Sequence, residues 1–404
     1  MRVKWPAALG WGCYLACSWT WVIGMYLPVY LVRDFGVLGW VAFAVPNVIG
    51  AAMVGCIWRN GCNRFVKHNE RVMRLFSVAT ILFHIAFLGW LLAGVAQDFL
   101  GSATAGGVLS ALLLVCALFL ARAGRTRRCA LAIAVYIISI IAIIGALLTS
   151  WGLQIRLPQF QGQQGFVALI FAAPALVMGF LFCPHLDLTL LRVRREVPGS
   201  TGTAAFTLGF GLFFLVLIAF TLAYAQGMIA DSLSLYVVVH INAQSVFTMS
   251  QHIAELSERG ALRTRVQNHP NRQRLFDSAL LILATLACLL VGPVIVTGWI
   301  PDSLVTDMPT SELVYELFIS LYGLVFPAWI WIVMIAGRRA PQRHRIAAFL
   351  IAMLLVGPMF GWGYLGKHYA LVAVGVGVVL GIGGLLRFTH NRVSQSRAKL
   401  QNTL

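Results

Sequence analysis

The chain has 404 residues, of which 60% are apolar and only 11% are charged, and its formal net charge is +17. Soluble domains carry about 25% charged residues, so this chain has too little charge to cover a globule of its size. The composition excludes a soluble enzyme, a disordered chain and a disulfide-stapled secreted module. It predicts an integral membrane protein that crosses the bilayer many times, built as one membrane domain over residues 1–404.

Apolar runs of about 20 residues, the length that a helix needs to cross about 30 Å of hydrocarbon, recur along the chain. The predicted spans are twelve in number and cover residues 7–32, 36–58, 73–96, 102–121, 129–151, 166–191, 202–226, 233–254, 275–299, 311–336, 346–366 and 368–387. Short linkers join them, so we expect no separate soluble domain. The predicted fold class is an all-α integral membrane protein that ends in a tail over residues 388–404.

The 30 lysines and arginines are distributed very unevenly over the linkers. If the N-terminus is cytoplasmic, the inside segments hold all of them except Arg33, Arg156 and Lys367. Positively charged loops are retained in the cytoplasm, so this bias predicts twelve spans with both termini cytoplasmic, in a bacterial-type inner membrane. The basic charge therefore reflects topology and attraction to membrane lipid, and we expect no nucleic-acid partner.

Two spans contain features that interrupt a membrane helix. Span 7–32 carries Gly24-Met25-Tyr26-Leu27-Pro28, where a flexible glycine and a missing amide donor predict an opened helix. Span 166–191 carries Cys183-Pro184-His185-Leu186-Asp187, which places an imidazole and a carboxylate inside an apolar run. Such groups are costly in hydrocarbon unless they pair or line a cavity. These are the first and the sixth spans, so two five-span units would have opposite topology.

This layout resembles the leucine-transporter (LeuT) fold, which is shared by the amino acid–polyamine–cation superfamily, the neurotransmitter/sodium symporters and the sodium/solute symporters. The resemblance covers about residues 7–336 and includes the short turn Val32–Gly36. It implies a 5+5 inverted repeat, with repeat one at about 7–151 and repeat two at about 166–336, followed by two accessory helices at about 346–387. It also implies that substrate and ions bind at the two interruptions and that the third and eighth spans complete the site.

Polar side chains in those two spans support this expectation. Span 233–254 carries a stripe of them at helical spacing, formed by His240, Gln244, Thr248 and Gln251 or His252. Facing lipid would be costly, so we expect the stripe to face the protein interior. In span 73–96, Ser77, Thr80 and His84 share one face, and the imidazole of His84 can bind a substrate or carry a proton. Hydrogen bonding between helices is the alternative role for all of these side chains.

The predicted substrate contacts are Ser18, Trp21, Gly24, Tyr26, His84, Phe182, His185, Asp187, His240 and Gln244. The aromatic members near the first interruption can stack on a solute or hold a cation, or simply provide packing bulk. Arg33 and Glu316 lie at the outer ends of their spans and would pair as an outer gate. Gly377 and Gly381 give the last span a small-residue face that favours a homodimer or close packing within the chain.

The resemblance also implies an ion site. In the family, sodium is bound by backbone carbonyls before the first interruption and by hydroxyl groups of the eighth span. The matching positions form a predicted sodium site at Cys17, Thr20, Ser245 and Thr248. The family has two adjacent hydroxyl residues on that helix, whereas Thr248 is followed by Met249. A proton carried by Asp187 or His185 is therefore the alternative coupling ion, and no other cofactor is expected.

Together these features predict an ion-coupled symporter that moves a small polar or cationic organic solute by alternating access. A major-facilitator transporter is the competing twelve-span fold, but the loop Arg59–Arg71 lacks the motif typical of that family. Two other functions stay open. One is an intramembrane enzyme acting on lipids, in which His185 and Asp187 supply metal or acid–base chemistry. The other is a structural or sensory membrane subunit that transports nothing.

Overall fold

The computed structural model of the protein describes residues 3–149, 162–229, 233–258 and 310–403, with four isolated positions (286, 290, 294 and 296) between the last two ranges. Helices are the only regular elements in these residues. The predicted span 275–299 lies outside the four ranges. An all-α architecture is thus confirmed for the described part of the chain.

The helices follow one another with short connections. In chain order they are α1 (Trp5–Trp19), α2 (Val22–Ile57), α3 (Cys62–Leu100), α4 (Ala103–Leu120), α5 (Arg125–Leu148), α6 (Gly165–Phe182), the 3-10 turn η1 (Cys183–Leu186), α7 (Leu188–Glu196), α8 (Gly199–Leu208), the π turn η2 (Gly209–Phe214), α9 (Leu215–Ile229), α10 (Leu235–Glu258), α13 (Thr310–Ser320), η3 (Leu321–Val325), α14 (Phe326–Ala328), η4 (Trp329–Ile335), η5 (Ala336–Arg339), α15 (Gln342–Leu365) and α16 (Tyr369–Thr403). Nine helical segments of the described residues are long and apolar enough to cross a bilayer. The total of twelve spans and the placement of the termini stay predictions.

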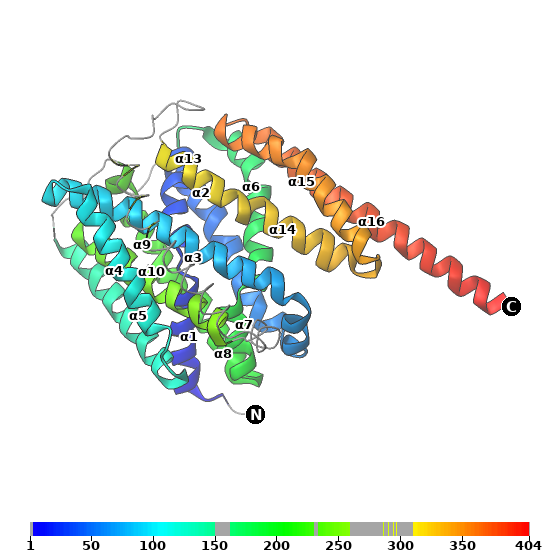
Figure 1. Cartoon of the computed structure of the whole chain (residues 1–404), viewed down its shortest axis with the longest axis horizontal. Helices are drawn as coiled ribbons and strands as arrows, with labels where there is room; N and C mark the ends of the chain where they lie inside the picture. The colour runs from blue at the N-terminus through cyan, green and yellow to red at the C-terminus, as the bar shows by residue number, and fades with distance from the viewer. Residues whose placement is uncertain are drawn as a thin grey trace.

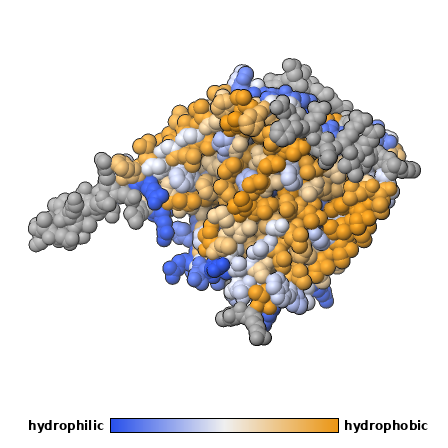
Figure 2. Space-filling view, turned by 180° about the vertical axis from the view of Figure 1, so that it is seen from behind, coloured by the Kyte–Doolittle hydropathy of each residue, from blue (hydrophilic) through white to orange (hydrophobic). Residues whose placement is uncertain are grey.

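Apolar side chains cover most of the outer surface of the bundle. Figure 2 shows a broad hydrophobic area over the body of the molecule, with hydrophilic residues at its upper and lower margins. Large apolar side chains such as Phe119, Leu148 and Leu354 are more than 70% exposed. A surface of this kind is stable only in contact with lipid, which identifies a multi-pass membrane protein.

The first long helix contains a kink at Gly36, where the predicted turn Val32–Gly36 ends. Gly36 has φ 66° and ψ −155°, a conformation that is essentially restricted to glycine. The carbonyls of Arg33 and Asp34 accept backbone hydrogen bonds from Gln163 and Gln164, at 3.1 and 2.7 Å. These bonds tie the kink to the segment that leads into α6, so two distant parts of the chain fix each other at this end of the bundle.

The helices that carry the two interruptions lie together in the bundle. Figure 1 shows α4 and α5 on one side, α15 and α16 side by side on the other, and the C-terminal part of α16 extending beyond the body. Helix α2 packs against α6, and α1 packs against α5, α8 and α10. A Cβ atom on Gly50 of α2 would collide with the Phe180 carbonyl of α6, so this glycine allows the two backbones to approach closely.

Candidate functional site

The first interruption lies between α1 and α2 at Thr20 and Trp21, so its predicted position at Gly24–Pro28 is wrong. The amide and the hydroxyl of Thr20 both donate to the Ala16 carbonyl, at 2.9 and 2.7 Å. The indole Nε1 of Trp21 donates to the Ser18 carbonyl at 2.8 Å. Because these donors satisfy the last carbonyls of α1, the helix ends there. Proline removes only one amide donor, and the segment Gly24–Pro28 stays helical.

The predicted interruption at Cys183–Asp187 is confirmed. Helix α6 ends in the single 3-10 turn η1, and Asp187 then adopts an extended conformation and begins α7 as its N-cap. Its carboxylate accepts a hydrogen bond from the Thr189 amide at 2.6 Å. Aspartate is one of the favoured capping residues because its oxygen satisfies an amide that has no partner within the helix. The same side chain is therefore fixed at the interruption, where it is completely buried.

A cavity of about 510 Å³, counting its opening, touches both interruptions. Its aromatic lining residues are Trp19, Trp21, Phe180, Tyr322 and Tyr364. Gly24, Gly179 and Gly323 leave space between these rings, and Asn47 and Cys183 add polar or polarisable groups. Two predicted substrate residues, Trp21 and Gly24, thus lie in its wall.

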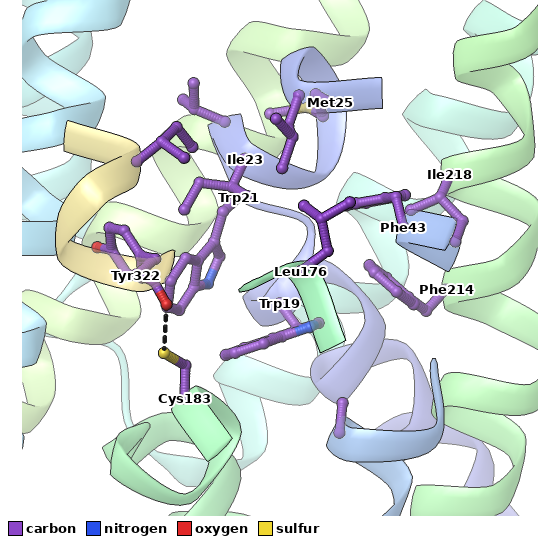
Figure 3. Close-up of a cluster of buried hydrophobic side chains, with 14 of the residues drawn as sticks. Trp19, Trp21, Ile23, Met25, Phe43, Leu176, Cys183, Phe214, Ile218 and Tyr322 are labelled. Atoms are coloured by element: carbon purple, nitrogen blue, oxygen red, sulfur yellow. Dashed lines mark hydrogen bonds between the residues drawn. The ribbon is translucent and has the colours of Figure 1, made fainter. Parts of the chain in front are cut away.

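Two indole rings form one wall of this cavity (Figure 3). The centroids of Trp19 and Trp21 are 4.4 Å apart, and the ring of Tyr322 meets Trp21 at 5.4 Å. Trp19 is held by a 2.7 Å hydrogen bond from Nε1 to Asn47 Oδ1. The thiol of Cys183 donates to the Tyr322 carbonyl at 3.3 Å, which joins the second interruption to η3. Aromatic faces at this spacing can stack on an organic solute or hold a cation.

Tyr26, another predicted substrate residue, lies in a second and smaller cavity of about 320 Å³. Its ring packs among those of Tyr30, Phe87, Trp90 and Tyr315, with centroids 4.8–5.4 Å apart. Its hydroxyl is 3.3 Å from the hydroxyl of Tyr30. This aromatic cluster fills the space between α2, α3 and α13.

An ion pair follows the aromatic cluster along α2. Arg33 makes two hydrogen bonds to Glu312, at 2.6 and 3.0 Å, and also contacts Asp34 at 2.8 Å. The predicted partner was Glu316, and that pairing is wrong: Glu312 lies one helical turn earlier on α13 and meets the guanidinium group in a bidentate arrangement. The pair joins α2 to α13 at the end of the bundle where Gly36 kinks the chain.

A second charged network lies near the C-terminal end of α10. Arg192 of α7 pairs with Glu255 of α10 and also with Glu196, at 3.2 Å, while Arg195 approaches Glu255 at 3.5 Å. Glu255 is completely buried. Burial of a carboxylate is tolerated here because two guanidinium groups compensate its charge. The network therefore fastens α7, which follows the second interruption, to α10.

Buried polar side chains lie beside the first interruption. The Oδ2 atom of Asp187 faces Nε2 of His252 at 3.9 Å, and neither atom has a hydrogen-bond partner among the described residues. Nδ1 of His252 is 3.1 Å from the hydroxyl of Ser77, and the rings of His252 and Trp21 form an edge-to-face pair with centroids 5.6 Å apart. These contacts bring together α3, α7 and α10 next to a residue that lines the cavity.

The predicted polar stripe of α10 is buried, as expected. His240, Gln244, Thr248, Gln251 and His252 are each at most 1% exposed. Gln244 donates to Ser139 Oγ at 2.9 Å and to Cys17 Sγ at 3.7 Å, so it links α10 with α5 and α1. His240 packs against Phe220 at 5.3 Å. Of these predicted substrate residues, neither Gln244 nor His240 lines the two cavities described above.

The residues of the predicted sodium site lie at the end of α1 and on α10. The hydroxyl of Thr248 donates to the Cys17 carbonyl at 3.1 Å, so these two positions are in contact. The hydroxyl of Thr20 turns back to Ala16 within its own helix. Ser245 Oγ is buried and has no hydrogen-bond partner within the described residues. The structure thus brings two of the four predicted ligands into direct contact.

Phe182 directly precedes the second interruption and His185 lies within it, and neither residue lines either cavity. Nδ1 of His185 accepts a hydrogen bond from Nε1 of Trp58 at 3.0 Å, at the end of α2. The ring of Phe182 stacks parallel to that of Trp331 at 6.4 Å. Both side chains therefore serve contacts between helices in this conformation.

One of the predicted polar residues of α3, Thr80, contacts the aromatic wall of the cavity. Nδ1 of His84 is 2.7 Å from the Thr80 carbonyl, one turn earlier in the helix. The hydroxyl of Thr80 is 2.9 Å from that of Tyr322, which lines the cavity. His84 is completely buried, so α3 contributes to the neighbourhood of the cavity through Thr80 rather than through the histidine itself.

Several residues of the site were missed from the sequence. Asn47, Tyr322, Glu255 and Glu312 were not singled out, and His252 was named only as one member of the polar stripe. Asn47 follows Pro46 inside the predicted span 36–58. A polar side chain within an apolar run is costly unless it has a partner, so the same argument that selected Asp187 applied to Asn47. Glu255 was overlooked because α10 extends four residues beyond the predicted span.

The described residues contain no group of three or more metal-ligating side chains placed to hold a metal ion. The sequence matches no known protein-family model and no curated protein, and the fold matches no solved structure.

Proposed function

We propose that the protein is a secondary transporter of the LeuT type that moves a small polar or cationic organic solute by alternating access, driven by an ion gradient. The observation that carries the proposal is the cavity whose walls include Trp19 and Trp21 at the first helix interruption and Cys183 at the second. Membrane helices are interrupted only where protein or a cavity surrounds the freed backbone groups. Two such interruptions at one cavity are the arrangement that binds solute in this transporter class.

The lining of the cavity supports an organic solute with a polar or positively charged group. Trp19, Trp21 and Tyr322 present aromatic faces, which attract cations in a water-poor site. Asn47 supplies an amide, although its Oδ1 atom is already engaged by Trp19. The buried carboxylate of Asp187 lies at the second interruption and adds a negative potential nearby.

The charged pairs on either side of the cavity support alternating access. Arg33 and Glu312 join α2 to α13, and Arg192 and Glu255 join α7 to α10. Each pair links two different helices, so it can separate without unfolding either one. We propose that one pair opens while the other stays closed, which exposes the cavity to the two sides of the membrane in turn.

Uptake into proteoliposomes tests the transport function. The purified protein would be reconstituted and offered a panel of radiolabelled amino acids, polyamines, quaternary amines and sugars, with and without sodium and pH gradients. We expect at least one solute to accumulate under one of the gradients. Trp21→Ala should abolish that accumulation, because it removes the ring shared by the cavity wall and the helix interruption.

Trp362→Ala is the matched control, since Trp362 is 68% exposed on α15 and lies outside the cavity lining. This variant should transport like the wild type. Failure of every solute to accumulate, together with unchanged thermal stability on addition of either ion or any solute, would disprove the transporter. Equal loss of uptake in both tryptophan variants would contradict a specific role of the cavity in transport.

A further inference from the structure

We propose that Asp187 and His252 form a proton-binding pair, in which the bound proton lies between Asp187 Oδ2 and His252 Nε2. The inference rests on the proposed transport function and deepens it, because this proton would be the coupling ion. It combines one residue of the second interruption with one of α10.

The geometry leaves room for a proton and little else. The two atoms are 3.9 Å apart, both side chains are completely buried, and neither atom has a hydrogen-bond partner among the described residues. A direct hydrogen bond between nitrogen and oxygen needs about 2.7–3.2 Å, so a small side-chain rotation closes the gap. A bridging water would need two such bonds and a separation of about 4.5 Å or more.

The chemistry of the two groups favours a proton over sodium. Hard cations such as sodium prefer oxygen ligands, whereas one of the two facing atoms is an imidazole nitrogen. The carboxylate of Asp187 caps α7 through the Thr189 amide, and the N-terminal end of a helix stabilises the ionised form. Burial opposes the charge on either side chain, but a proton taken up on His252 leaves the pair with no net charge, so we place the proton there. The resulting imidazolium donates from Nε2 to Asp187 and from Nδ1 to the Ser77 hydroxyl.

The surrounding groups leave Asp187 as the counter-charge for this proton. The titratable and charged side chains that face the pair are Tyr14 of α1, His84 of α3, Arg192 of α7, Glu255 of α10 and Tyr322 of η3. Glu255 is already compensated by Arg192 and Arg195. A buried cation needs a partner of opposite charge, and Asp187 is the acidic group in direct range of His252.

Trp21 connects the pair to the cavity. Its ring meets His252 at 5.6 Å and Tyr322 at 5.4 Å, and both Trp21 and Tyr322 line the cavity. An imidazolium is attracted to the aromatic ring more strongly than a neutral imidazole. Proton binding at His252 therefore biases the position of a cavity-wall residue at the first interruption, which couples proton occupancy to solute binding.

Nitrogen NMR of protein labelled with 15N-histidine tests the pair without requiring a solute. The chain has nine histidines, and the signal of His252 is identified by its loss in His252→Gln. We expect both ring nitrogens of His252 to become protonated as the pH falls through the range of about 8 to 5. In Asp187→Asn this uptake should disappear at these pH values. Asparagine caps helices as well as aspartate does, so the variant keeps α7 intact.

His240→Gln is the matched control, because His240 is also completely buried on α10 and packs against Phe220. It should leave the titration of His252 unchanged. The pair is refuted if His252 stays neutral throughout the range, or if it titrates identically in Asp187→Asn.

Transport measurements distinguish the proposed proton-binding pair from the proposed transport function. For a solute found in the panel, Asp187→Asn and His252→Gln should lose accumulation driven by a pH gradient but keep exchange of labelled for unlabelled solute at equal pH. Titration of the pair without uptake of any panel solute would support the proton site and contradict the transporter. Wild-type accumulation in Asp187→Asn would contradict the coupling role of the pair and leave the transporter standing.

Discussion

At the scale of single residues, buried polar groups explain which helices stay together. Glu255 on α10 has no contact with solvent and is compensated by Arg192 and Arg195 of α7. Trp19 and Asn47 form a similar neutral link between α1 and α2. The first link joins α7, which follows the second interruption, to α10, and the second link joins the two helices on either side of the first interruption.

Removing the Glu255 charge should destabilise the protein. Glu255→Gln leaves the buried Arg192 and the partly buried Arg195 without their shared carboxylate, so we expect the free energy of unfolding to fall by about 3 kcal/mol. Thermal unfolding in detergent measures the change. Asp98→Asn is the control, since Asp98 is exposed on α3 and its change should stay within about 0.5 kcal/mol. Equal stabilities of the two variants would show that the buried network contributes nothing.

At the scale of helices, the sequence indicated which elements are irregular better than where they break. The segment Cys183–Asp187 was located correctly, because a proline and two polar side chains coincide there in an apolar run. The first interruption was misplaced, because Pro28 is accommodated in α2 while the hydroxyl of Thr20 and the indole of Trp21 end α1. Such side-chain caps depend on rotamers that composition and spacing do not specify.

At the candidate site, the sequence likewise indicated which side chains are buried but not which partners they contact. Burial of the α10 stripe followed from the cost of exposing polar groups to lipid. The partners did not follow: Arg33 pairs with Glu312 rather than Glu316, because the rotation of α13 about its axis decides which carboxylate faces α2. The role of His252 likewise depends on its approach to Asp187, 65 positions earlier in the sequence.

The kink in α2 gives a prediction at the scale of one element. Gly36→Ala forces a side chain into a backbone conformation that only glycine adopts easily, so we expect the free energy of unfolding to fall by about 1–3 kcal/mol. Gly94→Ala is the control. Gly94 lies inside α3 with open space around its Cβ position, and alanine there should stabilise the helix by about 0.5–1 kcal/mol. Destabilisation by Gly36→Ala together with stabilisation by Gly94→Ala in thermal unfolding would support the role of the kink. Stabilisation by Gly36→Ala would contradict it.

At the scale of the whole molecule, the distribution of charge predicts the orientation in the membrane. All but three of the 30 lysines and arginines belong to segments that we expect on one side of the membrane. We expect a green fluorescent protein fused to the C-terminus to fluoresce in bacteria, since this reporter folds in the cytoplasm. Alkaline phosphatase at the same position should be inactive. The reverse pattern would require an odd number of spans or the opposite orientation.

The close approach of α2 and α6 limits how the molecule can change shape. With no side chain on Gly50, the backbone of α2 rests directly against the Phe180 carbonyl, and any sliding of one helix along the other would force atoms into contact. We therefore expect the two helices to move as a single rigid body. Bending is left to the short non-helical stretches at Thr20–Trp21 and around Asp187, which act as hinges for the half-helices α1 and α7. We thus expect the mobile parts of the molecule to be α1 and α7, which would move against a fixed pair of helices, α2 and α6.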